Sequence, residues 1–151
     1  MILIDTNALI VLILGLIDEN LLGKHKRASI YSKEDFYRLL NVIGDFKNLL
    51  VLPNIWTEVD NLLNNFQGNH KRVYILKIRE IVSKSAEKYL ETRFCLENQY
   101  FERLGLTDST ILELAKECKF IITSDSKLSD YANANGISVY DMIQKRNEDF
   151  R

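Results

Sequence analysis

Residues 1–7, Met-Ile-Leu-Ile-Asp-Thr-Asn, decide the fold of this chain, because four apolar residues run directly into an acid and two small polar residues. An uninterrupted apolar run is typical of a central parallel strand that is covered on both faces. In open α/β sheets, ligands bind beyond the carboxyl ends of such strands, so Asp5 stands where a functional acid is expected. An equally weighted interpretation is that Asp5 only caps the helix that begins near Asn7.

The composition predicts one domain over residues 1–151 with a single buried core, since 46% of the residues are hydrophobic and only 6 are Gly and 1 is Pro. The net charge of −1 gives no global basic field, so any binding of nucleic acid must come from local clusters of Lys and Arg. Cys95 and Cys118 match no metal-binding spacing and are too few for a disulfide framework. They indicate a reducing compartment, and we expect a cytoplasmic location.

The segment from Ala8 to Ile17 is apolar apart from Gly15, which predicts a buried helix. It is shorter than the roughly 20 residues that a membrane-spanning helix needs. No positively charged region precedes it, so it is not expected to be a secretory signal, and no membrane partner is predicted.

The rest of the chain alternates between strand and helix patterns, which favours a three-layer α/β/α sandwich around a parallel sheet. Further strands are predicted at 49–52, within 119–125 and at 137–140, the last followed by a polar tail. Helices are predicted from Ser32 to Gly44, from Pro53 onward, over 70–91, over 98–104, from Thr107 as the N-cap, and over 127–134.

Four acids stand out by their positions at one edge of this predicted sheet. Asp5 and Asp125 follow strands, while Glu58 and Asp108 lie near the starts of helices. Clustered carboxylates repel one another unless a cation compensates them. A site of carboxylates alone favours Mg²⁺ or Mn²⁺, and two such ions ~4 Å apart can activate water for phosphodiester hydrolysis. The pattern therefore points to a nuclease.

The motifs around these acids occur in a fixed order along most of the chain. They are Leu3-Ile4-Asp5-Thr6-Asn7, Leu52-Pro53-Asn54-Ile55-Trp56-Thr57-Glu58, Leu106-Thr107-Asp108-Ser109 with Leu114-Ala115, and Ile122-Thr123-Ser124-Asp125 with Lys127-Leu128. This series resembles the acidic blocks of the PIN-domain ribonucleases, which include the VapC-type toxins of toxin–antitoxin pairs.

The resemblance implies a sheet of about five parallel strands between helices. It implies that Asp5, Glu58, Asp108 and Asp125 are the catalytic and metal-coordinating residues, with Asn7 and Thr123 as polar supports. Asp130 is expected on a solvated helix face rather than as a fifth acid of the site. The remaining acids considered, expected to be surface or cap residues, are Asp18, Glu19, Asp60 and Asp141.

Basic residues gather at Lys24–Arg27, at His70–Arg72 and along the predicted helix that follows. Most such runs are solvated helix faces, although a nuclease with an acidic centre needs a basic rim for phosphates. The aromatic residues considered for stacking on bases are Tyr31, Tyr37, Trp56 and Tyr74, and core packing is the preferred role of Trp56.

The leading hypothesis is a Mg²⁺- or Mn²⁺-dependent endoribonuclease acting on single-stranded RNA, with the toxin of a toxin–antitoxin pair as one form of it. The partners considered are RNA, an antitoxin protein and a second copy of the chain. The alternative is a catalytically inactive PIN-like scaffold that binds RNA or protein. A third hypothesis, in which Asp5 accepts a phosphoryl group, ranks low because Asn7 stands where such phosphatases have a second Asp.

Overall fold

The computed structural model describes residues 1–150, and its strands form one sheet in which every neighbouring pair is parallel. The order across the sheet is β3-β2-β1-β4-β5. The strands are β1 (Ile2–Ile4), β2 (Leu49–Val51), β3 (Ala86–Glu87), β4 (Phe120–Thr123) and β5 (Val139–Asp141). The predicted α/β class with a parallel sheet of five strands is confirmed.

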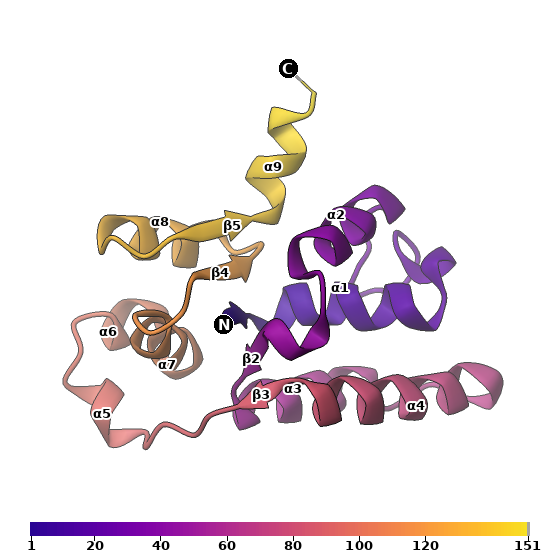
Figure 1. Cartoon of the computed structure of the whole chain (residues 1–151), viewed down its shortest axis with the longest axis horizontal. Helices are drawn as coiled ribbons and strands as arrows, with labels where there is room; N and C mark the ends of the chain where they lie inside the picture. The colour runs from indigo at the N-terminus through magenta and orange to yellow at the C-terminus, as the bar shows by residue number, and fades with distance from the viewer. Residues whose placement is uncertain (151) are drawn as a thin grey trace.

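Helices cover both faces of the sheet (Figure 1). One layer holds α1 (Thr6–Ile17), α2 (Lys33–Ile43), α3 (Pro53–Leu63) and α4 (Gly68–Lys84), with the short 3-10 helices η1 (Glu19–Leu21) and η2 (Phe46–Asn48). The other layer holds α5 (Arg93–Leu96), α6 (Phe101–Leu104), α7 (Leu106–Ala115) and α8 (Ser126–Ala134). The chain then ends in α9 (Met142–Glu148), which packs against α2.

The order of the strands explains this division between the layers. From β1 the chain moves to β2 and β3 in one direction, and it then returns to β4 and β5 in the other. Because crossovers between parallel strands are right-handed, the two directions place their helices on opposite faces. The chain therefore diverges at the boundary between β1 and β4, where α/β proteins usually bind their ligands.

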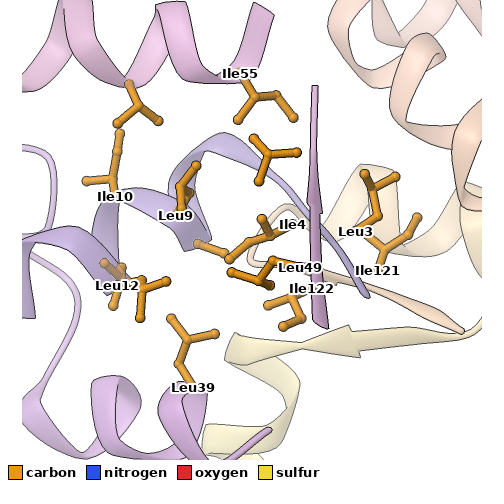
Figure 2. Close-up of a cluster of buried hydrophobic side chains, with 14 of the residues drawn as sticks. Leu3, Ile4, Leu9, Ile10, Leu12, Leu39, Leu49, Ile55, Ile121 and Ile122 are labelled. Carbon is orange, nitrogen blue, oxygen red and sulfur yellow. The ribbon is translucent and has the colours of Figure 1, made fainter. Parts of the chain in front are cut away.

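The core forms around β1 and α1 (Figure 2). Every residue of β1 is buried, and so is the stretch of α1 from Ala8 to Gly15. A helix that is apolar on all sides is typical of a fully enclosed position. Around α1 pack α2, α3, α4 and β4, so the predicted buried helix is confirmed and lies at the centre of its layer.

Polar residues set the ends of several helices. Ser32 and Asp35 form a capping box at the start of α2, and Gly44, with φ of +72°, ends that helix as predicted. Pro53 occupies the first turn of α3, where its missing N–H has no partner to lose. These local signals are why the boundaries of α2 and α3 agree with the sequence.

Three local predictions were wrong. The helix predicted over 70–91 ends at Lys84, because residues 86–87 become extended and pair with β2 as strand β3. The predicted polar tail contains α9, whose N-cap is Asp141. Thr107 is not an N-cap, since α7 begins one residue earlier, after Gly105 with φ of +82°.

Among the helices of residues 1–150, none combines the length and the hydrophobicity that a membrane crossing requires.

A substitution at Gly15 tests how tightly α1 is packed against α2. In a helix interior, Gly→Ala normally stabilises by about 1 kcal/mol. Here a Cβ would lie 2.2 Å from Cδ2 of the buried Phe36 ring. We expect Gly15→Ala to lower the free energy of unfolding by about 1–3 kcal/mol, as overpacking does. Thermal melts should show a fall of about 2–4 °C per kcal/mol.

The control for this overlap is the double variant Gly15→Ala/Phe36→Leu, compared with Phe36→Leu alone. Once the ring is gone, the alanine should be neutral or stabilising. A Gly15→Ala protein that melts above the wild type would show instead that Phe36 moves aside without cost.

Candidate active site

All four predicted acids line one pocket with a volume of about 190 Å³. They come from four elements: Asp5 follows β1, Glu58 lies on α3, Asp108 on α7 and Asp125 follows β4. The complete lining is Asp5, Thr6, Asn7, Glu58, Thr107, Asp108, Ile111 and Asp125. Residues that are far apart in sequence thus meet beyond the carboxyl ends of β1 and β4.

A larger hollow, of about 890 Å³, lies elsewhere, between the α5–α6 segment and α8. Its lining combines Glu97 and Glu102 with Arg103 and aromatic residues, and it contains none of the four acids. Size alone does not identify a site, because function depends on convergent polar groups with perturbed pKa values. The smaller, acidic pocket meets that criterion.

Asp5 is the most enclosed of the four acids, with 5% of its surface exposed. Its Oδ1 accepts a hydrogen bond from the Ala8 backbone N–H at 3.0 Å, and its Oδ2 accepts one from the Thr123 hydroxyl. Asp5 is therefore the N-cap of α1, as one interpretation of the sequence held, and it also lines the pocket. The two roles are compatible.

Thr123 connects two of the acids. While its hydroxyl donates to Asp5, the same oxygen accepts the backbone N–H of Asp125 at 3.0 Å. The Oδ1 atom of Asp125 in turn caps α8 by accepting from the N–H groups of Lys127 at 2.9 Å and Leu128 at 3.3 Å. Thr123 is fully buried, and its hydroxyl contacts both Asp5 and the backbone of Asp125.

Glu58 and Asp108 complete the pocket from opposite layers. The exposed Glu58 is held against α1 because the Thr6 hydroxyl donates to its Oε2 at 3.0 Å. Asp108 is half-buried in the first turn of α7, and Asn7 lines the pocket as an exposed side chain. The pocket is therefore formed by the two helical layers together.

Burial and mutual repulsion raise two of the pKa values. Burial raises the pKa of Asp5 to about 7, and the charges of Asp108 and Asp125 add to the rise. The hydrogen bonds from Thr123 and Ala8 act in the other direction and lower this pKa. Burial likewise raises the pKa of Asp108 to about 6, helped by Asp125 and Glu58 and opposed by Lys127. At neutral pH the cluster therefore favours the binding of a positive charge, whether a proton or a cation.

The donor set fits a hard cation, since it consists of carboxylate oxygens without His or Cys. Among residues 1–150, no three or more acidic, His or Cys side chains lie close enough together to enclose an ion directly. Mg²⁺ usually keeps several waters and binds through one or two carboxylates. With roughly 30 Å³ per water, a pocket of about 190 Å³ has room for a hydrated ion.

The sequence analysis included Lys127 in the fourth acidic motif but gave it no role in the site. Its positive charge lowers the pKa of Asp108, and its Nζ donates to the backbone oxygen of Arg103 at 2.8 Å. It lies in the first turn of α8, two residues after Asp125. The signal was present in the sequence, as a cation two residues after the fourth acid.

The basic residues that were considered as a rim do not line the pocket. On α4, Lys77 and Lys84 both pair with Glu80, while Lys88 pairs with Glu117. These ion pairs agree with the simpler interpretation of a solvated face.

The aromatic predictions had mixed outcomes. Tyr31 and Tyr74 are buried, so they do not offer free ring faces for stacking on bases, and Trp56 packs against the core as expected. Tyr37 is 49% exposed.

The other acids lie outside the pocket. Asp18 caps η1 and Asp141 caps α9, as predicted, and Asp130 is exposed on α8. The exposed Asp60 accepts a hydrogen bond from the hydroxyl of Tyr74 at 2.6 Å.

Comparisons with known proteins add no assignment: no model of a known protein family matches the chain, and no curated protein matches it.

The raised pKa values predict how stability depends on pH without metal. The native pKa of Asp5 is about 7, against 3.8 for the free group, so the native state binds this proton more tightly than the unfolded chain. As pH falls from about 8 towards 5, the free energy of unfolding should rise, by up to about 1.4 kcal/mol per pH unit for each such acid. Urea denaturation in EDTA at a series of pH values measures this slope.

Asp5→Asn is the matched variant, because its carboxamide oxygen can still accept the Ala8 N–H and its NH2 group can donate to the Thr123 hydroxyl oxygen, but it cannot titrate. Burial is the main cause of the lowered pKa of His25, so protonation of His25 lowers the free energy of unfolding below about pH 6.5. His25 is present in both proteins, so the difference between their slopes reports on Asp5. Equal slopes in the two proteins would contradict the raised pKa of Asp5.

Proposed function

We propose that this protein is a Mg²⁺- or Mn²⁺-dependent endoribonuclease that hydrolyses phosphodiester bonds of single-stranded RNA. The observation that carries the proposal is the convergence of Asp5, Glu58, Asp108 and Asp125 on one pocket. Bringing four carboxylates together is unfavourable unless a cation is part of the site. Burial is the main cause of the raised pKa values of Asp5 and Asp108, and repulsion from the neighbouring carboxylates adds to both.

In this proposal the four acids would hold the cation partly through its bound waters, and the bound cation would supply an activated water and stabilise developing phosphate charge. Asp5 is fixed by Ala8 and Thr123, so its orientation does not depend on substrate. In this proposal Asn7, on the lining, and Lys127, whose charge acts on Asp108, would contact phosphate oxygens of the RNA backbone. Glu58 is exposed, so the pocket is open to solvent on its side.

The resemblance of the four motifs to PIN-domain ribonucleases supports the same proposal and extends it. We place the chain among VapC-like toxins, with an antitoxin protein and a second copy of the chain as its proposed protein partners. Both cysteines are free thiols, which agrees with a proposed cytoplasmic location.

A second candidate is the catalytically inactive scaffold that binds RNA or protein. The observation that favours it is that the acids also have structural roles, since Asp5 and Asp125 cap α1 and α8. In that case the pocket would bind no cation, and the following two experiments separate the candidates.

The first experiment is cleavage of mixed-sequence RNA oligonucleotides with Mn²⁺ or with EDTA. Cleavage should require the metal. Asp5→Asn, Glu58→Gln, Asp108→Asn and Asp125→Asn should each lower the rate by about 100-fold or more, since even residues that only support metal ligands are worth 10–100-fold. Asp60→Asn, on the same helix as Glu58 but outside the pocket, should keep wild-type activity. Cleavage that survives EDTA would exclude the metal mechanism.

The second experiment measures thermal stability with and without Mn²⁺. An ion at ~100 times its dissociation constant adds about 2.7 kcal/mol to the free energy of unfolding when it does not bind the unfolded chain. For a domain of this size that is a rise of about 5–10 °C in melting temperature. The rise should be smaller in Asp125→Asn, which loses a charge and a ligand. An unchanged midpoint at millimolar Mn²⁺ would favour the inactive scaffold.

A further inference from the structure

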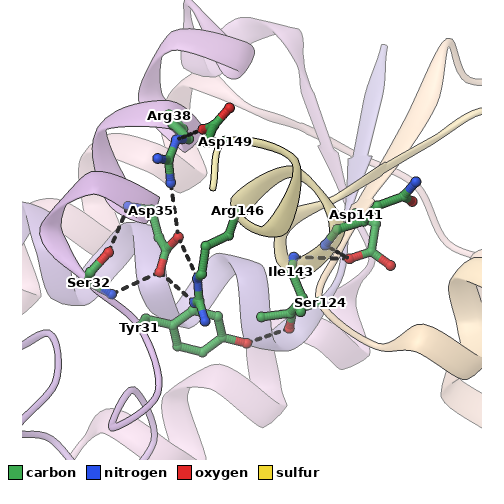
Figure 3. Close-up of polar contacts among 10 residues, drawn as sticks. Tyr31, Ser32, Asp35, Arg38, Ser124, Asp141, Ile143, Arg146 and Asp149 are labelled. Atoms are coloured by element: carbon green, nitrogen blue, oxygen red, sulfur yellow. Dashed lines mark hydrogen bonds and ion pairs between the residues drawn. The ribbon is translucent and has the colours of Figure 1, made fainter. Parts of the chain in front are cut away.

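A tyrosine from outside the pocket contacts the segment that carries the fourth acid (Figure 3). Tyr31 precedes the N-cap of α2 and is only 6% exposed, and its hydroxyl donates to the Ser124 hydroxyl oxygen. Ser124 lies between Thr123, which binds Asp5, and Asp125. The tyrosine therefore contacts the centre of the segment 123–125.

Tyr31 is itself held from the C-terminal helix. The guanidinium of Arg146 on α9 lies 5.8 Å from the centre of the Tyr31 ring. Arg146 also makes a bidentate pair with Asp35, through Nε to Oδ1 at 3.1 Å and Nη2 to Oδ2 at 2.6 Å. Asp35 is 3% exposed, so its carboxylate is buried in this pair, and Figure 3 shows the two bonds.

A second pair strengthens the attachment of α9 to α2. Nε of Arg38 lies 2.8 Å from Oδ2 of Asp149. In one pair the arginine, Arg146, belongs to α9, and in the other the arginine, Arg38, belongs to α2. The two pairs together hold α9 against α2. The position of Arg146 over the Tyr31 ring follows from this attachment.

We propose that Tyr31 and Arg146 are positioning residues of the candidate active site and act through Ser124. The inference rests on the proposed function, because it concerns how the same acids are held in place. Neither residue touches the pocket; Tyr31 fixes the segment 123–125, and Arg146 fixes Tyr31.

The segment 123–125 needs such a contact because one side of it is open. A hollow of about 390 Å³ is lined by Ser124, Ser126, Asp141, Ile143, Gln144, Asn147 and Glu148. A shift of Ser124 into this space would move its neighbour Asp125. It would also move Thr123, whose hydroxyl donates to Asp5. One hydrogen bond from Tyr31 thus constrains two acids together.

The test compares Tyr31→Phe with Tyr37→Phe. The first keeps the ring beside Arg146 and removes only the hydroxyl that binds Ser124. The second removes a hydroxyl that donates to Glu19, far from the segment 123–125 in sequence and on a tyrosine that is 49% exposed. In the metal-free protein, amide hydrogen exchange at Asp125, whose N–H bonds to Thr123, should be about 10-fold faster in Tyr31→Phe, as the loss of one hydrogen bond allows, and unchanged in Tyr37→Phe. Equal exchange at Asp125 in wild type and Tyr31→Phe would overturn the role of Tyr31.

Two further measurements separate positioning from simple stability. Tyr31→Phe should bind Mn²⁺ about 10-fold more weakly by calorimetry, and should lower kcat by a similar factor with KM for RNA unchanged. Arg146→Lys keeps a positive charge beside Asp35 but loses the planar fork, so it should change exchange at Asp125 in the same direction. Wild-type exchange in Arg146→Lys would remove Arg146 from the proposal.

The two proposals fail in different ways. A wild-type protein that cleaves no RNA with any metal would overturn the nuclease function. The exchange comparison needs neither RNA nor metal, so it still decides whether Tyr31 and Arg146 position the segment 123–125.

Discussion

The burial of the Asp5 carboxylate at the end of the central strand is the constraint on which the rest of this structure depends. Removing an ionised carboxylate from water is costly unless hydrogen bonds or a cation replace the lost hydration. Asp5 receives two hydrogen bonds, from the Ala8 N–H and the Thr123 hydroxyl, yet its pKa is about 7. The protein groups therefore compensate its charge only in part. A neutral side chain would cap α1 at lower cost, and this supports a role for the charge itself.

The topology explains why the other acids gather around this residue. β1 and β4 are neighbours, and the chain leaves them towards opposite faces of the sheet. The backbone after each strand therefore opens a crevice in which Asp5 and Asp125 meet. α3 contributes Glu58 from one layer and α7 contributes Asp108 from the other. The pocket is a consequence of the strand order, and no single local motif could have formed it.

The parts that the sequence predicted correctly are those with strong local signals. The apolar run before Asp5, the capping box at Ser32 and Pro53 after β2 each mark an element through neighbouring residues. β3 has only two residues, and its extended form depends on the free edge of β2. It was missed because the helical pattern of α4 continues through it.

The parts that were missed depend on contacts between distant residues. Arg146 and Asp35 are separated by 111 positions, so nothing local in the polar C-terminal sequence indicated that α9 would attach to α2. Tyr31 was considered as a base-stacking residue, but the packing of α9 buries it. The four acids were singled out because Asp5 and Asp125 follow strands and Glu58 and Asp108 lie in the early turns of helices, whereas the residues that hold them share no such pattern.

The shared hydroxyl of Thr123 links the charge of the pocket to its geometry. This oxygen has one proton to donate, and it donates to Asp5 while accepting the N–H of Asp125. When Asp5 is ionised, it can only accept, so the Thr123 proton has a fixed direction. When Asp5 is protonated, the two hydroxyl groups compete, and Thr123 can turn away. A bound cation would keep Asp5 ionised and so preserve the arrangement that orients Asp125, which means that ion binding and the order of the segment 123–125 should reinforce each other.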